Sequence, residues 1–208
     1  MSEIYRPTWA EINLSAIEKN YTYVQKLNPH KLIIPVIKAD AYGHGAIKLM
    51  RFLYTIGVKF FAVSLLEEAI ELRKENKDIK ILMLGPILAD QFEIAAKHHI
   101  TITLYSVDII KGLLKTNLDI DVHLKIDTGM NRYGLKDKEL IIKQINLLQA
   151  HKTIHLEGIF THFSTVSTNK KFFDKQVIRF RHILADILVK PKMIHVSNSS
   201  SSIKYEHK

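Results

Sequence analysis

The sequence predicts an α/β fold, and a (β/α)8 TIM-type barrel is the favoured architecture. Short, nearly continuous apolar runs rich in β-branched residues alternate with longer segments whose apolar residues recur three and four positions apart. The first pattern is typical of strands buried on both faces of a parallel sheet, and the second of helices that cover the sheet. Hydrophobic residues make up 47% of the 208 residues, which excludes a disordered chain.

Seven strands are expected, and their order is 32–37, 60–65, 79–84, 100–104, 122–126, 156–163 and 193–196. Helices are expected at 15–27, 46–56, 66–76, 88–97, 107–115, 138–150 and 169–189, and Ser106 is an N-cap type of residue before one of them. No glycine-rich nucleotide motif follows the first strand, and polar residues stand where strands end, which favours a barrel over a doubly wound sheet. Because a barrel needs eight strands, this one is expected to be truncated after the seventh.

Composition excludes several classes of protein. Cysteine is absent, which rules out disulfides and thiolate metal sites and fits a cytoplasmic location. No apolar run is long enough to span a membrane, and the start lacks the apolar segment of a signal peptide. The net charge of +9 makes nucleic acid a partner to consider. The basic residues are scattered and lack interleaved aromatic residues, so solvated surface lysines are the preferred interpretation.

Lys38 ends the first predicted strand. An amine held against apolar neighbours has a lowered pKa, which makes this lysine a candidate for a Schiff base with a carbonyl cofactor. Gly43 and Gly45 give a turn into the next helix, and Tyr42 supplies a donor near that helix N-terminus, where anions are favoured. A lysine that simply lies along apolar surface at a strand end is the competing interpretation.

A second group of polar residues lies in and just after the strand at 122–126. His123, Lys125 and Asp127 share one face of this strand, and polar residues facing a core are costly unless they are paired. A structural ion pair between Lys125 and Asp127 is one interpretation. Arg132 lies in a loop between two glycines, and the paired N–H donors of its guanidinium suit a carboxylate or a phosphate.

Two further polar positions follow later strands. His162 ends the strand at 156–163, where a lone histidine is more often structural than catalytic. Asn198 and Ser199 follow the seventh strand, and hydroxyl and backbone N–H groups at such a turn can hold a phosphate. A polar turn or a serine linker is the alternative there.

Five segments, four motifs and the opening of the chain, together resemble one family. V-I-K-A-D-A-Y-G-H-G closely resembles the cofactor-lysine motif of the alanine racemases, which are fold-type III pyridoxal-phosphate (PLP) enzymes, and the opening P-T-W-A-E-I-N-L-S-A-I-E-K-N resembles their N-terminus. K-I-D-T-G-M-N-R-Y-G, E-G-I-F-T-H-F-S and H-V-S-N-S are similar to later motifs of the family. The last has Ser197 where alanine is usual, and residues 200–202 are polar where the family has a short apolar helix.

The resemblance implies a PLP-binding barrel that interconverts L-alanine and D-alanine and so supplies D-alanine for the cell wall peptidoglycan. Lys38 would form the aldimine with PLP and act as one of two catalytic bases. Tyr42 would hydrogen-bond the cofactor phosphate, Ser199 would bind the same phosphate with Asn198 beside it, and His162 would lie beside the pyridine ring. These residues are the cofactor site that the resemblance implies.

The resemblance also implies a substrate site. Arg132 would help to recognise the substrate carboxylate, and Lys125 is a possible carbamylated lysine that would orient this arginine. No metal is implied. The small amino acid that the enzyme prefers stays open, because relatives in the family racemise serine or lysine.

The family continues beyond the part that this chain matches. Its members have an eighth strand, an arginine on the pyridine nitrogen, and a C-terminal β domain that supplies the second catalytic tyrosine across a homodimer. Residues 1–208 are therefore expected to be an incomplete N-terminal PLP-binding barrel domain, inactive or weakly active alone, with no nucleic acid or membrane partner. The alternative is a non-catalytic PLP-binding homeostasis barrel, against which the motif K-A-D-A-Y-G-H-G argues.

Overall fold

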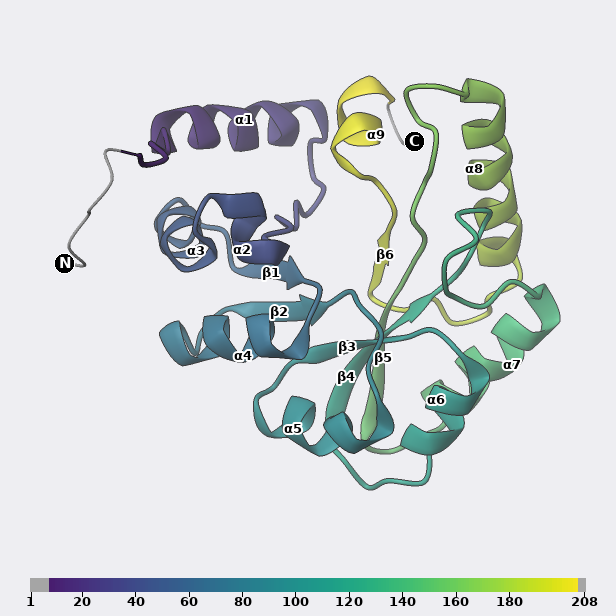
Figure 1. The fold of residues 1–208 in the computed structure, drawn as a ribbon. Helices are drawn as coiled ribbons and strands as arrows, with labels where there is room; N and C mark the ends of the chain where they lie inside the picture. Colours follow the sequence, from purple (N-terminus) through teal and green to yellow (C-terminus); the bar gives the residue numbers. More distant parts are fainter. Residues whose placement is uncertain (1–7, 206–208) are drawn as a thin grey trace.

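A computed structural model describes residues 8–205 and contains a six-stranded parallel sheet that curves into a half-barrel (Figure 1). The strands follow one another in chain order, as in a (β/α)8 barrel. Their bounds are β1 (Phe60–Val63), β2 (Lys80–Met83), β3 (Thr101–Leu104), β4 (Ile120–Lys125), β5 (Ile154–Phe160) and β6 (Met193–His195). The predicted α/β barrel class is therefore confirmed, with the described residues forming part of such a barrel.

Helices alternate with the strands and cover the convex side of the sheet (Figure 1). They are α1 (Leu14–Leu27), α2 (Lys38–Gly43), α3 (Ala46–Thr55), α4 (Leu66–Glu75), α5 (Phe92–Lys97), α6 (Val107–Leu113), α7 (Lys138–Gln149), α8 (Lys170–Ala185) and α9 (Ser199–Lys204), with a 3-10 turn η1 (Ala89–Gln91) before α5. Ser106 caps α6, as predicted, by accepting a hydrogen bond from the Ile109 N–H at 3.3 Å. In the described part of the chain, no helix is long and apolar enough to cross a membrane.

The two faces of the sheet carry different side chains. Alternate residues of each strand, such as Phe61 and Ile81, pack against the helices in one large apolar core. The residues between them line the inside of the half-barrel, where Phe60 and Leu82 form a small separate apolar cluster. The inner face of β4 instead carries His123 and Lys125, both fully buried. The curvature of the sheet thus brings polar groups into the interior of the barrel.

The strand predicted at 32–37 is wrong. Only Val36 pairs with β1, through a single parallel bridge to Ala62, and its side chain is 40% exposed. Pro35 lies inside the apolar run and has no N–H to donate to a ladder, so the run cannot extend as a strand. The chain nevertheless stays beside β1, because the Ile37 N–H donates to the Ala62 carbonyl at 2.9 Å. Lys38 consequently begins α2 and does not end a strand.

The ends of the half-barrel are connected by helices. β1 and β6 are the outer strands of the sheet, and α1 lies against α9 (Figure 1). The Asn28 side chain, just after α1, donates a hydrogen bond to the Ser202 carbonyl of α9 at 2.9 Å. The first and last described helices are thereby joined across the open side of the sheet.

Candidate active site

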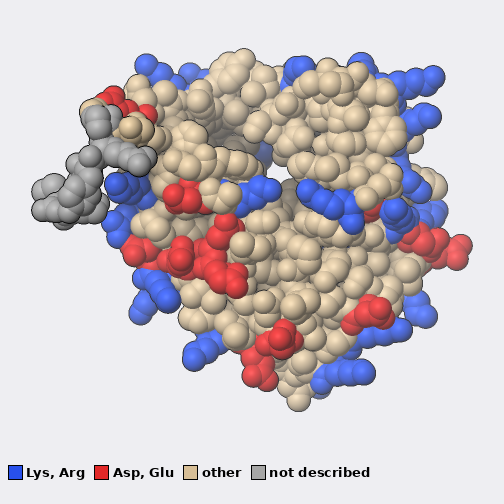
Figure 2. Space-filling view, in the orientation of Figure 1, with Lys and Arg blue, Asp and Glu red and all other residues tan. Residues whose placement is uncertain are grey.

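The predicted site residues lie at or after the carboxyl ends of parallel segments, and Lys125 is the last residue of β4. Lys38 comes after the bridge at Val36, Arg132 after β4, His162 after β5 and Ser199 after β6. Because parallel strands end at the same edge, these side chains converge on one rim of the half-barrel. The electrostatics agree: the positive charges of Arg132, Lys125 and Lys38 all act on His162. Figure 2 shows Lys and Arg side chains beside a hollow near the centre of the face shown.

The turn that carries Lys38 has an unusual backbone. Ala39, Asp40, Ala41 and Tyr42 all have φ between 50° and 56°, so α2 makes a left-handed turn. Each L-residue in this conformation costs roughly 1–2 kcal/mol, or about 4–8 kcal/mol for the four residues together. The surrounding contacts must therefore hold the turn in place.

Several hydrogen bonds hold this turn. The Ala41 N–H donates to the Ile37 carbonyl at 3.0 Å, and the Asp40 carboxylate accepts from the Ala46 N–H at 2.6 Å, at the start of α3. The turn leaves the Tyr42 side chain 63% exposed, with its ring centroid 6.0 Å from Lys38 Nζ. Lys38 and Tyr42 are thus neighbours in the fold.

Lys125 is a buried amine without a hydrogen-bond partner in the described part of the chain. Its side chain is 1% exposed, and Nζ lies 4.7 Å from the Tyr133 ring centroid and 5.6 Å from that of Phe160. Burial and, to a smaller extent, the neighbouring Arg132 lower the pKa of Lys125 to about 8, against the opposing effect of Asp127. A substantial fraction of the amine is therefore neutral near neutral pH.

The structural ion pair considered for Lys125 and Asp127 does not form among the described residues. Asp127 Oδ1 accepts from the Gly129 N–H at 2.9 Å and from the Asn131 N–H at 3.1 Å, while Oδ2 lies 3.7 Å from Lys136 Nζ. The carboxylate therefore holds the loop that follows β4, and Lys125 is left for another partner.

Arg132 and Lys125 approach the same aromatic ring. The Arg132 guanidinium carbon lies 5.0 Å from the Tyr133 ring centroid, and the Tyr133 hydroxyl donates to the Leu84 carbonyl at 2.7 Å. The hydroxyl anchors this ring to the end of β2, so the ring fixes the distance between the two cations. Sequence reasoning missed Tyr133, although its position next to Arg132 in the motif was the available signal.

His162 and Asn198 connect the remaining strand ends. Burial lowers the pKa of His162, and the neighbouring cations lower it further, so the neutral imidazole is favoured. The Asn198 side chain donates to the Phe163 carbonyl at 3.1 Å and accepts from the Ser201 N–H at 3.0 Å. Asn198 thereby caps α9 and ties it to the end of β5, while Ser199 is exposed at the first turn of α9.

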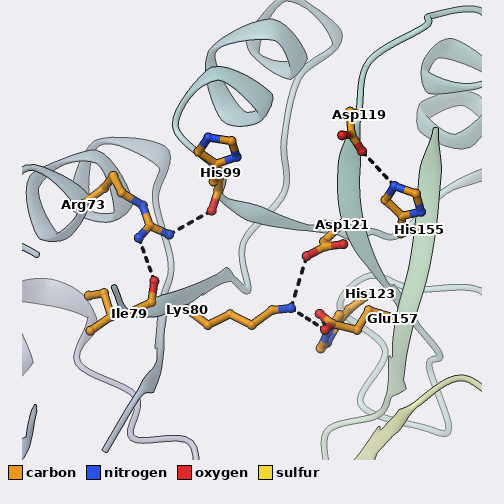
Figure 3. A network of polar contacts seen from close by, with 9 residues as sticks. All are labelled: Arg73, Ile79, Lys80, His99, Asp119, Asp121, His123, His155 and Glu157. Atoms are coloured by element: carbon orange, nitrogen blue, oxygen red, sulfur yellow. Dashed lines mark hydrogen bonds and ion pairs between the residues drawn. The ribbon is translucent and has the colours of Figure 1, made fainter. Parts of the chain in front are cut away.

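A polar network lies below this rim inside the half-barrel (Figure 3). Lys80 pairs with Glu157 and, at 3.1 Å, with Asp121, and Glu157 faces His123 Nε2 at 3.5 Å. His123 Nδ1 lies 2.7 Å from Nε2 of His195. Burial would raise the pKa of Glu157, but hydrogen bonds from His123 and Lys80 outweigh it and lower that pKa to about 2.

The last member of the network touches the site. Burial, with a smaller contribution from His123, lowers the pKa of His195 to about 3, so this imidazole is neutral. Its ring stacks on Phe160 with centroids 4.6 Å apart, and Phe160 also faces Lys125. Sequence reasoning placed His123 on the same strand face as Lys125 and included His195 only within a motif, and it missed the contacts of Lys80 and Glu157.

Comparison with known proteins agrees with this arrangement. The family model described as "Alanine racemase, N-terminal domain" matches residues 12–208. The alanine racemase of Staphylococcus saprophyticus is 39% identical over 96% of this chain and 53% of its own length. The crystal structure of alanine racemase from Oenococcus oeni superposes with a TM-score of 0.88 at 33% identity, over 94% of this chain and 57% of the other.

The same fold also occurs with a differently named substrate. Histidine racemase from Leuconostoc mesenteroides superposes with a TM-score of 0.85 at 29% identity, over 91% of this chain and 52% of its own. The present chain spans about half the length of the curated relatives that it matches. The match over residues 12–208 shows that this chain belongs to the alanine racemase N-terminal domain family.

Proposed function

We propose that the protein carrying this chain is a PLP-dependent alanine racemase and that residues 1–208 form its N-terminal PLP-binding barrel domain. The observation that carries the proposal is the convergence of Lys38, Lys125 and Arg132 around His162. The basic side chains of Lys38 and Arg132 beside a neutral imidazole fit a ligand that bears a phosphate and a carboxylate. The curated relatives, named alanine racemase, support the choice of alanine.

The residues present fit PLP. Lys38 offers the amine for the covalent bond to the cofactor, and the neighbouring Tyr42 is exposed enough to reach its phosphate. Ser199 offers an exposed hydroxyl and a backbone N–H at the start of α9, which Asn198 caps. His162, kept neutral, would stack or hydrogen-bond beside the pyridine ring without adding charge. These five residues are the proposed cofactor site.

The proposed chemistry follows from these positions. PLP, when bound, withdraws electrons from the amino acid and acidifies its Cα–H. Lys38 would remove or return that proton on one face of Cα, and Arg132 would hold the carboxylate so that this face meets the lysine. Racemisation also needs a proton donor on the opposite face. We propose that a tyrosine from outside this chain supplies it in a homodimer.

We also propose that Lys125 carries a carbamate. The reaction needs a neutral amine, which attacks CO2 and releases one proton. With a pKa of about 8, about a quarter of the amine is neutral at pH 7.5, roughly 200-fold more than for a lysine with the ordinary value of 10.5. The new carboxylate would replace a buried, unpartnered cation with an anion close to Arg132, and so orient its guanidinium.

The wider setting follows from the activity. A D-alanine-forming enzyme would serve cell wall synthesis in the cytoplasm, and the absence of cysteine supports a reducing compartment. Neither nucleic acid nor membrane is proposed as a partner. The substrates are L-alanine and D-alanine.

The cofactor site can be tested by chemical labelling. The chain is mixed with PLP, reduced with borohydride and digested, and the labelled peptide is identified by mass spectrometry. We expect the label on Lys38, and its loss in Lys38→Ala with no new label elsewhere. A label spread over the surface lysines, or no label, would contradict the assignment of Lys38.

The catalytic part of the proposal needs a second assay. Because the opposite face of Cα has no proposed proton donor here, the 208-residue chain should show at most trace racemisation of alanine in a coupled D-alanine assay. Turnover within about tenfold of a full-length relative would show that a second base lies within these residues, and would refute this part of the proposal.

A further inference from the structure

The structure points to Glu68 as a positioning residue for the active-site lysine, and we propose that it fixes the backbone turn that carries Lys38. This inference deepens the proposed function and rests on it for the role of Lys38. Glu68 lies in the first turn of α4, after β1, and is half-buried. It is thirty positions from the lysine in sequence, and α4 contacts α2 in the fold.

The two oxygens of the Glu68 carboxylate have different partners. Oε1 accepts a hydrogen bond from the Ala39 N–H at 2.5 Å. Oε2 accepts from the Ser64 N–H at 2.8 Å and from the Leu65 N–H at 3.0 Å. One carboxylate therefore joins the turn that follows β1 to the turn that carries Lys38, through three charge-assisted hydrogen bonds.

The bond to Ala39 acts directly on Lys38. The Ala39 nitrogen belongs to the same planar peptide group as the Lys38 carbonyl. Fixing the direction of this N–H therefore fixes the rotation about the Lys38 Cα–C bond. Lys38 is also the point where the chain enters the left-handed turn, which a residue such as alanine does not adopt without outside support.

The other hydrogen bonds of the turn do not hold the peptide between Lys38 and Ala39. Asp40 fixes the far end of the turn through the Ala46 N–H, and the Ile37 carbonyl holds Ala41. The peptide between Lys38 and Ala39 is held by Glu68 from the neighbouring helix. Loss of this bond should let the peptide rotate, and the lysine amine would then sample more directions.

Glu68→Gln separates this role from the capping of α4. Glutamine has one carbonyl oxygen, and its NH2 group cannot accept a hydrogen bond. The oxygen is expected to face the two donors of Ser64 and Leu65, which leaves the NH2 group against the Ala39 N–H. The variant thus keeps the cap of α4 and loses the bond to the lysine turn. Glu67→Gln removes the same charge one position earlier on an exposed site and is the matched control.

The first measurement is amide hydrogen exchange in the protein without cofactor. In Glu68→Gln we expect the Ala39 amide to exchange about tenfold faster or more, while the Ser201 amide, capped by Asn198 on a distant helix, keeps its rate. Glu67→Gln should leave both rates unchanged. An unchanged Ala39 rate in Glu68→Gln would overturn the proposal.

The second measurement is the rate at which PLP and borohydride label Lys38. We expect this rate to fall several-fold in Glu68→Gln and not in Glu67→Gln, at a temperature where thermal melts show both variants to be folded. Faster Ala39 exchange with an unchanged labelling rate would also overturn the proposal, since the turn would then be looser without consequence for the lysine. If the unmodified chain is not labelled at Lys38 at all, the proposed function fails, and the exchange rates alone judge whether Glu68 holds the turn.

Discussion

Replacement of Lys125 by methionine should stabilise the fold by an amount that depends on pH. The side chain is almost completely buried between two aromatic rings, and in the described part of the chain its amine has no hydrogen-bond partner. Burial, then Arg132, lowers the pKa of Lys125 from 10.5 to about 8, against the opposing effect of Asp127. Methionine fills a similar volume with an unbranched chain and carries no charge.

The magnitude follows from the two pKa values. A tenfold change in proton affinity is worth about 1.4 kcal/mol, so a fall from 10.5 to about 8 corresponds to roughly 3 kcal/mol. The folded protein binds this proton less tightly than the unfolded chain does. The contribution of Lys125 to wild-type stability is therefore lowest below pH 8. It rises between pH 8 and 10.5, where the unfolded chain binds more protons at this amine. The advantage of Lys125→Met should be greatest at pH 7, with about 3 kcal/mol of it lost by pH 10.5.

The assay is urea unfolding at several pH values between 7 and 10.5 in buffer freed of CO2. Lys143→Met, on the exposed side of α7, measures what the loss of a surface charge alone does. The difference in unfolding free energy between Lys125→Met and wild type should shrink as the pH rises. A difference that stays constant with pH would refute the reasoning, because the amine would then have the same proton affinity in both states.

The same variants test the carbamate. Bicarbonate added near pH 8 should stabilise the wild-type protein, because CO2 reacts only with the neutral amine and the product pairs with Arg132. Lys125→Met should not respond. Equal responses of the two proteins would contradict carbamylation at this position.

Two further predictions concern the interior network, and both are checked by denaturation. Glu157→Gln should cost up to about 3 kcal/mol at pH 7 and flatten the acid side of the stability profile, because the wild-type contribution is present above about pH 4.5 and is lost as the pH falls towards the Glu157 pKa of about 2. A steep acid profile that persists in the variant would contradict this. Gly158→Ala should destabilise by about 1–3 kcal/mol, because a Cβ there would lie 2.6 Å from the His123 ring, and an unchanged melting temperature would show that the ring can move away.

The fold could be predicted from the sequence where apolar runs are continuous. β1, β2, β3 and β6 lie within predicted strands, and β4 and β5 overlap theirs but begin two residues earlier, because residues buried on both faces of a parallel sheet leave a run rich in β-branched and aromatic side chains. The segment 32–37 has the same composition and still fails to form a strand, since Pro35 interrupts the ladder and Leu32 is 63% exposed. Composition alone does not reveal which backbone donors a strand can use.

The sequence allows the residues of the candidate site to be named, but not their geometry. The motifs identified Lys38, Arg132 and His162 at the ends of parallel segments, and the topology brings these ends together. The left-handed turn at 39–42 could not be predicted, because alanine, aspartate and tyrosine prefer the right-handed region and tertiary hydrogen bonds override that preference. The pattern Ser64-x-x-Glu67 would have indicated Glu67 as the capping acid, but Leu65 is the N-cap and Glu68 takes that role.

The interior network explains why the barrel keeps charges where an apolar core would be more stable. Buried ion pairs seldom add stability compared with well-packed apolar residues, so their presence needs another reason. Alternate residues of β4, from Asp121 through His123 to Lys125, run from the floor of the half-barrel up to the rim, and the first two are held by Lys80 and Glu157. His123 fixes His195, whose ring stacks on the Phe160 ring that also faces Lys125. Lys125 at the end of β4 is thus backed by a stacked ring that the network holds in place. This arrangement favours a fixed position for the Lys125 amine over maximal stability, which is what the proposed site would need.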